Sequence, residues 1–422
     1  MQFVNLTPLD ALCFDSIDTL GRECNTVVMK VGYSIHIDPT SNLATLSLKE
    51  EQPLPLLMED SYWGEKLSSS LRQESDLAPF KPMCDLIVLG KGYAPEGKPV
   101  DTWPVQIEVL SESVGKPDAL HTILKKNLII CPPGIFKRGF FGWKLQRDKT
   151  ITQVPLRWEN SFGGTNQIPN PRFDEKPEQP EFLFNEVCFS NTLGCGWQHK
   201  GFTAATHKAG LTPPKQMPAP CIFNRGDILE KPVTVKHRRG INSAIQICAA
   251  ANTYPHRPAG MGAIPRHWAP RIALGGTYDD NWVNTRWPLL PRDFDERFWN
   301  CAPQDQQLPW PSANCQINTW FLFNPKIAPK GYVELRLPGH RAFVMARLNN
   351  KSPLPLPAQI DTLILDTDTL ELQVVWRCRL IQLPIFAQLE ARFETDPAAP
   401  LLKWKMPKAN SQTSPRKLSY AE

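Results

Sequence analysis

The sequence lacks the features of an exported or membrane-spanning chain. Its first twenty residues have no basic region and no sustained apolar core, and Asp10, Asp15 and Asp18 interrupt them. They therefore do not fit a secretory signal peptide. No stretch approaches the roughly 18 consecutive apolar residues that a transmembrane helix needs. We expect a cytoplasmic protein that does not associate with a membrane.

Recognisable catalytic and metal-binding motifs are also missing. The chain contains no G-x-S-x-G nucleophile elbow, no H-E-x-x-H motif and no C-x-x-C pair among its 11 cysteines. Without an export signal, this odd number of cysteines predicts buried, reduced thiols. A cluster of Cys188, Cys195, His199 and His207 would have a spacing that does not match the usual zinc patterns. We expect no catalytic residue, no metal and no cofactor, and we predict that the protein is not an enzyme.

Two short stretches carry only weak signals for nucleotides or nucleic acids. Residues 92–98, GYAPEGK, match G-x-x-x-x-G-K, but Pro99 stands where a magnesium-binding Ser or Thr is needed. Pro95 removes a loop amide, and the segment that follows predicts a strand rather than a phosphate-binding helix. The net charge of +5 is small and the basic run KHRRG, 236–240, is nearly isolated, so we do not expect a nucleic-acid partner.

The sequence does not favour long helices, because 42 residues are proline. Proline breaks helix interiors and is confined to edges and turns of sheets. Short β-branched or alternating runs between turn residues predict strands instead, at 26–37, 43–48, 85–90, 103–110, 127–131, 151–158, 331–336, 342–348, 360–365 and 370–381. The first two form a predicted hairpin. We predict a mainly β, antiparallel sandwich-like architecture with few short helices.

These strand patterns divide the chain into predicted parts. Residues 1–164 form an N-terminal β-rich part and residues 271–404 a C-terminal β-rich part. Residues 165–270 are rich in Pro, Gly, Asn and aromatics and predict a coil-rich middle, in which 242–251 fits either a strand or a short helix. Residues 385–395 fit a short helix. The polar tail, 405–422, is predicted to be disordered.

Aromatic and charged residues gather in one proline-punctuated stretch, 275–307. Paired carboxylates such as Asp293 and Asp295 beside aromatic rings suggest a glycoside hydrolase as one alternative. The interpretation that we favour is a loop that organises itself: Arg286 and Arg297 pair with Asp293, Asp295 or Asp305, and the rings anchor the loop to the core. The anchoring rings would be Trp282, Trp287, Phe294 and Phe298. A partner-binding face is the second alternative.

Five stretches together resemble a bacterial family of uncharacterised-domain proteins that are encoded beside type VI secretion effectors. They are NLTPL (5–9), ESDLAPFKPMCDLIVLGKGYAPEGK (74–98), PLRWENSFGG (155–164), NP (170–171) and the whole of 275–307. The residues that carry the resemblance are Glu74, Asp76, Lys81, Gly163, Gly164, Tyr278, Asp279, Trp282, Arg286, Asp293, Asp295, Arg297 and Asp305.

The resemblance implies a cytoplasmic adaptor or chaperone. Such a protein would bind and stabilise an effector, one that carries a PAAR-type region, and help to load it onto the secretion spike. The spike protein is a further candidate partner. The family is described without catalytic residues, so the matching residues would bind the partner or organise the loop. The alternatives are a carbohydrate-active enzyme that uses the 275–307 carboxylates and a structural component of the spike.

Overall fold

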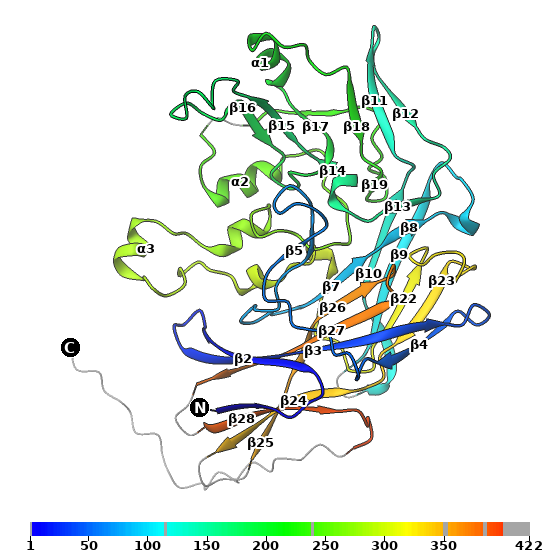
Figure 1. Ribbon diagram of the computed structural model, residues 1–422, viewed down its shortest axis with the longest axis vertical. Coiled ribbons are helices and arrows are strands. Elements are labelled where there is room, and N and C mark those ends of the chain that lie inside the picture. Colours follow the sequence, from blue (N-terminus) through cyan, green and yellow to red (C-terminus); the bar gives the residue numbers. More distant parts are fainter. Residues whose placement is uncertain (1, 114–115, 238–239, 349–352, 383–385, 400–422) are drawn as a thin grey trace.

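A curled β-sheet of twelve strands forms the centre of the molecule (Figure 1). The computed structural model describes residues 2–113, 116–237, 240–348, 353–382 and 386–399. In spatial order, the strands of the large sheet are β19 (Ile222–Phe223), β10 (Lys116–Ile130), β9 (Trp103–Ser113), β22 (Gln316–Trp320), β23 (Tyr332–Arg336), β4 (Leu43–Leu48), β3 (Glu23–Ile37), β27 (Glu371–Ile381), β26 (Gln359–Asp366), β7 (Cys84–Leu89) and β21 (Gln307–Leu308), with β2 (Asp10–Ile17) beside β3.

Strand β3 is covered on both faces, because residues 24–33 are all buried and successive side chains point to opposite faces. Along one edge β3 pairs antiparallel with β27, and along the other it pairs with β2 and then β4. The predicted β3–β4 hairpin is therefore confirmed. Many apolar side chains of the central strands share one core, which includes Val27, Met29, Val31, Leu86, Val88, Val105, Ile107, Leu363 and Val374. Others belong to two smaller clusters, among them Ile87 and Ile364 in one and Val28 and Val375 in the other.

The large sheet joins strands that are far apart in the sequence. Strand β22 pairs antiparallel with β9, whereas β26 pairs parallel with β7 and β23 pairs parallel with β4. Strands from within residues 1–164 therefore alternate in the sheet with strands from within residues 271–404. Most of the predicted strands are confirmed. Only part of the predicted strand at 151–158 forms, as β13 (Gln153–Pro155), and a 3-10 turn follows it.

A second sheet of four strands lies at the lower end of the molecule in Figure 1. Its spatial order is β1 (Gln2–Asn5), β28 (Phe386–Glu394), β24 (Arg341–Leu348) and β25 (Leu354–Pro357). The expectation of a short helix at 385–395 is wrong, because β28 occupies this segment and pairs with β24 and β1. Good helix formers fill β28, but hydrogen bonding along both edges and burial of Leu389 and Ala391 override that preference.

The middle part of the chain lies over one end of the large sheet, at the top of Figure 1. Three strands from the end of residues 1–164 join it, and all the strands there are short: β11 (Gly134–Gly139), β12 (Gly142–Arg147) and β18 (Gln216–Ala219) form one sheet, β14 (Phe162–Gly163), β17 (Cys195–His199) and β20 (Val233–Val235) another, and β15 (Thr165–Pro169) pairs with β16 (Phe182–Val187). Two helices accompany them, α1 (Phe202–Lys208) and α2 (Ala244–Ala251). Residues 242–251, for which the sequence allowed either a strand or a short helix, thus contain a helix. The Ser243 side chain caps this helix by accepting a hydrogen bond from the Gln246 N–H.

The remaining elements are short. They are β5 (Ser61–Tyr62), β6 (Leu71–Gln73), β8 (Lys91–Tyr93), α3 (Asp280–Thr285) and the 3-10 turns η1 (Pro95–Gly97), η2 (Trp158–Asn160), η3 (Arg271–Gly275), η4 (Glu296–Trp299) and η5 (Gln304–Gln306). The prediction of a mainly β protein with few short helices is confirmed. In the part of the chain that the structure describes, none of the helices has the length and apolarity to cross a bilayer. The predicted disordered tail, 405–422, lies outside the described residues.

Candidate functional site

The 275–307 stretch folds into short helical turns that its own side chains stabilise. Asp279 begins α3, because its carboxylate accepts the N–H of Trp282 at 2.8 Å. The Tyr278 ring packs edge-on against the Trp282 ring, with 4.8 Å between the ring centroids. The Trp282 indole N–H donates to the backbone oxygen of Leu289 at 2.9 Å. Local bonds therefore fix the conformation of this half of the stretch.

The charged residues of the stretch pair only partly as predicted. Arg297 binds Asp295, with its Nε 2.9 Å from the carboxylate Oδ2. Arg286 instead donates to two backbone carbonyls, one within the stretch and one in the β2–β3 turn, each at 2.9 Å. Asp305 pairs with Lys126 on β10 at 2.7 Å. The arginines thus brace the backbone as well as the carboxylates.

Donors from the stretch itself engage both carboxylates of the possible catalytic pair. Asp293 accepts the N–H and the hydroxyl of Thr277 at 3.0 and 2.7 Å, and these bonds lower its carboxyl pKa. Asp295 caps η4, and its side-chain bond with Arg297 lowers its pKa. Both groups are therefore held ionised near neutral pH, and both close local turns.

The aromatic rings anchor the stretch unevenly. Phe294 is buried and packs against Phe298 and Trp299, with ring centroids 5.7 and 5.9 Å away. Trp287 does not anchor the loop as expected, because 68% of its surface is exposed. Together with the exposed Tyr278 and Val283, it leaves an apolar surface around α3.

Glu74, which the resemblance singled out, lies in a buried ion pair. Its carboxylate accepts two bonds from the Arg271 guanidinium, both at 2.8 Å, and a third from Arg266 at 2.7 Å. Both Glu74 and Arg271 are buried. Since Arg271 begins η3, this pair fixes the chain just before the 275–307 stretch.

Asp76 and Lys81 are buried in the same way. Asp76 binds the Lys30 ammonium of β3 at 3.0 Å, and Lys81 binds Asp85 of β7 at 2.9 Å. Asp85 also accepts the backbone N–H groups of residues 301–302 at 2.9 and 3.1 Å, close to the end of the 275–307 stretch. Lys81 and Asp85 therefore fasten the end of the stretch to β7, whereas Asp76 is held against β3. These buried residues have little surface to offer a partner.

Asp85 was not among the residues predicted from the sequence. Burial would raise its pKa, but Lys81 and the N–H donors of residues 301–302 lower it below its ordinary value. The signal in the sequence was a single carboxylate inside the apolar run of β7, CDLIVL. A charge at such a position needs a buried partner.

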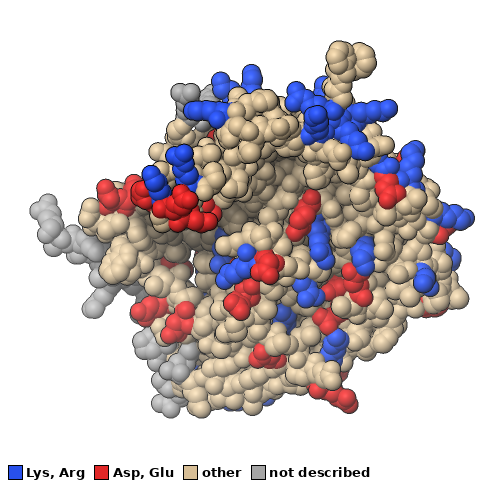
Figure 2. All heavy atoms as spheres, turned by 45° about the horizontal axis from the view of Figure 1, so that its top comes forward, with Lys and Arg blue, Asp and Glu red and all other residues tan. Residues whose placement is uncertain are grey.

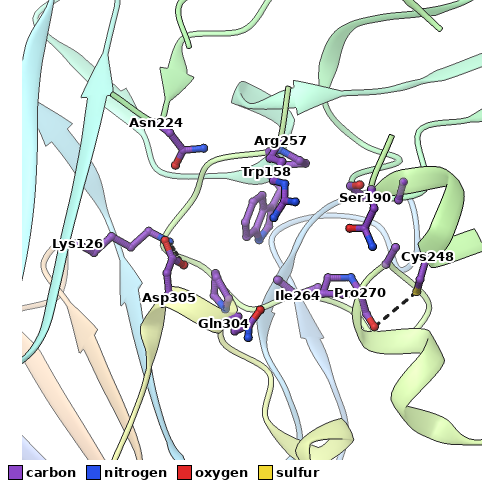
Figure 3. A pocket seen from close by; sticks show the side chains of 15 residues that line it. Lys126, Trp158, Ser190, Asn224, Cys248, Arg257, Ile264, Pro270, Gln304 and Asp305 are labelled. Carbon is purple, nitrogen blue, oxygen red and sulfur yellow. Dashed lines mark hydrogen bonds and ion pairs between the residues drawn. The ribbon is translucent and has the colours of Figure 1, made fainter. Parts of the chain in front are cut away.

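A cavity of about 550 Å³ opens between the middle part and the large sheet (Figure 3). At one side of it lies the Lys126–Asp305 pair, in which the Lys126 side chain is 4% exposed and that of Asp305 is 62% exposed. Burial lowers the pKa of Lys126, and the bond with Asp305 partly offsets this effect. The other lining residues include Trp158, Ser190, Asn224, Cys248, Arg257 and Gln304. The volume suits a small molecule or a few residues of a peptide.

The β11–β12 hairpin, which comes from within residues 1–164, projects beside the middle part at the top of Figure 1. Phe140 and Phe141 form its tip between two glycines, and they are 97% and 99% exposed. Residues 137–149 contain five basic residues and one acidic residue, a net charge of +4. Figure 2 shows Lys and Arg side chains gathered on this side of the molecule. The sequence signal that we missed was GFFG at a turn between two strands.

A group of side chains able to hold a metal consists of Glu186, His199 and His237. His199 was among the residues weighed for zinc from the sequence, but Cys188, Cys195 and His207 are not part of this group. His237 belongs to the KHRRG run, of which residues 238–239 lie outside the described residues.

A family model described as "Uncharacterized protein conserved in bacteria (DUF2169)" matches residues 20–377. No curated protein matches the chain. No solved structure matches it either.

Proposed function

This chain is a member of the DUF2169 family of uncharacterised bacterial proteins, and we propose that it is an adaptor for a type VI secretion effector. In this role it binds and stabilises the effector, one with a PAAR-type region, in the cytoplasm and helps to load it onto the secretion spike. The link to secretion comes from the resemblance of the sequence stretches described above. The structure adds a surface suited to binding a protein.

The observation that carries the proposal is the exposed tip of the β11–β12 hairpin. Burying a Phe side chain contributes about 1.5–3 kcal/mol, so Phe140 and Phe141 together can supply about 3–6 kcal/mol to a complex. Their exposure is nearly complete, so this contribution is available to a partner. Aromatic side chains are enriched at the centres of protein interfaces.

The chemistry around the tip specifies the kind of partner. Lys137, Arg138 and Lys144 are exposed beside the two rings, and the Arg138 guanidinium lies over the Trp143 ring at 5.9 Å. Positive charge around an apolar tip favours a partner with an apolar cleft and an acidic rim, because complementary charge speeds association and fixes orientation. The exposed Tyr278, Val283 and Trp287 around α3 offer a second surface for the same partner.

Co-purification with the product of the neighbouring effector gene tests the proposal. We expect the native protein to retain the effector, and the Phe140→Ser/Phe141→Ser variant to lose it while keeping its melting temperature. Ile245→Ser is the matched control, because Ile245 is also exposed but lies on α2. Deleting the gene should lower effector abundance and secretion, and unchanged levels of both would contradict the adaptor role. Fractionation should leave the protein in the cell, whereas a spike component would be secreted.

A further inference from the structure

We propose that Glu186, His199 and His237 bind a zinc ion. Glu186 lies near the end of β16, His199 is the last residue of β17, and His237 follows β20 by two residues. One ligand atom from each lies within 4.8 Å of the other two, and His237 Nδ1 is 3.0 Å from Glu186 Oε2. The site is separate from the cavity and from the hairpin tip, and it does not depend on the adaptor role.

The backbone brings these three residues together. Strands β17 and β20 run parallel with His199 opposite Val235, which places His237 just beyond the paired region. Asn166 lies opposite Glu186 in the β15–β16 pair, and its side chain accepts the His199 N–H at 2.6 Å. Backbone pairing and this side-chain bond therefore hold the three residues close together before any ion arrives.

The donor set and its spacing fit zinc. Zinc bonds to imidazole nitrogen and carboxylate oxygen are about 2.0–2.2 Å long, which puts tetrahedral ligand atoms about 3.3 Å apart. Glu186 and His237 are already close to that separation, at 3.0 Å. Two histidines and one carboxylate leave the fourth zinc position for water, and the Glu186 side chain is 34% exposed, so water can reach the site.

The surroundings of His237 are those of an oriented metal ligand. Its Nε2 is 2.7 Å from the Tyr254 hydroxyl, which directs Nδ1 toward Glu186. The ring stacks on Phe189 with 4.5 Å between centroids, and its side chain is 6% exposed. A second partner that fixes the ring of a histidine is characteristic of zinc sites. Glu186 and His237 therefore form the fixed half of the site.

His199 completes the site by turning its ring. In this structure its Nδ1 accepts the Gly201 N–H at 3.1 Å. If Nδ1 coordinates the ion, the bond from the Gly201 N–H is lost. If Nε2 coordinates it, the ring proton lies on Nδ1 and repels the Gly201 N–H, so the bond is lost as well. In both cases the ring can then turn toward Glu186 and His237. A bound ion would then tie β16, β17 and the segment after β20 together.

The test is a calorimetric titration of chelator-treated protein with zinc chloride. We expect one zinc per chain and, in excess zinc, a rise in melting temperature of about 3 °C. Glu186→Gln and His199→Asn should weaken binding at least about tenfold. The Gln side chain still accepts a bond from His237, so Glu186→Gln keeps the local fold. His207→Ala, which changes an exposed histidine outside the group, should bind zinc like the native protein.

Cobalt(II) gives an independent readout of the ligands. We expect absorption typical of nitrogen and oxygen ligands without a thiolate-to-cobalt band, because the group contains no cysteine. Zinc binding that is unchanged in both Glu186→Gln and His199→Asn would overturn the proposal. A thiolate band, loss of binding in His207→Ala, or no zinc uptake by the native protein would also overturn it.

Discussion

Asp85 shows how single residues stabilise this molecule. It is buried within the apolar run of β7, where the Lys81 ammonium and two backbone N–H groups surround its carboxylate. Removing an ion pair from water costs several kcal/mol per ion, and the loss of one partner leaves the other charge buried and unpaired. The bonds of Asp85 to residues 301–302 also make it the link between β7 and the end of the 275–307 stretch.

Asp85→Asn should lower the free energy of unfolding at pH 7 by about 3–5 kcal/mol, because it leaves Lys81 charged and buried. The pKa of Asp85 is lower in the folded chain than the roughly 3.9 of an unfolded Asp. The contribution of its charge is therefore present above about pH 4 and is lost as the pH falls further, so the difference between variant and native protein should shrink in acid. Urea unfolding at several pH values measures this difference in the free energy of unfolding.

Asp295→Asn is the control for that experiment. Asp295 also pairs with an arginine, but the pair is largely exposed, and Asn can still cap η4. Asp295→Asn should therefore change the free energy of unfolding at pH 7 by less than about 1 kcal/mol. Two outcomes would show that the buried Lys81–Asp85 pair does not stabilise the fold as proposed. One is an equal decrease in the free energy of unfolding for the two variants, and the other is a decrease for Asp85→Asn that becomes larger in acid.

Sequence reasoning identified only some of the residues that matter. The resemblance pointed to Glu74, Asp76 and Lys81, all of which are buried. Asp85, the partner of Lys81, is only four residues away, but Arg271 and Lys30, the partners of Glu74 and Asp76, are distant in the sequence. The bond from Arg297 to Asp295 was predictable because it is local. Nothing local indicated that Asp305 would meet Lys126, since 179 positions separate them.

At the scale of elements, strands with strong patterns were predictable and their pairing was not. The hairpin β3–β4 followed from two apolar runs and a turn. The parallel pairing of β26 with β7 joins segments about 280 residues apart, and no local pattern encodes it. Strand β28 was mistaken for a helix because its composition favours one, whereas its neighbours β1 and β24 decide its structure.

Leu389→Ala tests the structure of β28. The Leu389 side chain is fully buried in the main hydrophobic core, so truncation should cost about 2–5 kcal/mol in the free energy of unfolding. Gln388→Ala, at the adjacent and less buried position, should change it by less than about 0.5 kcal/mol. Chemical denaturation measures both. Similar small effects for the two variants would contradict the assignment of β28 as a strand in a packed sheet.

At the scale of the whole molecule, the structure separates a stable core from the surfaces that can bind a partner. The large sheet joins strands from both ends of the chain, and the buried Lys81–Asp85 pair links it to the end of the 275–307 stretch. The middle part lies over one end of that sheet and carries part of the cavity wall and the proposed zinc ligands, and the β11–β12 hairpin projects beside it. Changes at the hairpin tip should therefore alter binding and leave the fold intact.

The proposed binding of a type VI effector through the hairpin tip is measured by the dissociation constant of that complex. We expect Phe140→Ser/Phe141→Ser to raise this constant at least about a hundredfold, since the two rings supply at least about 3 kcal/mol. We also expect weaker binding at high salt, because basic residues flank the tip. Equal constants for the native protein and the double variant, or no complex with the native protein, would contradict the proposed binding.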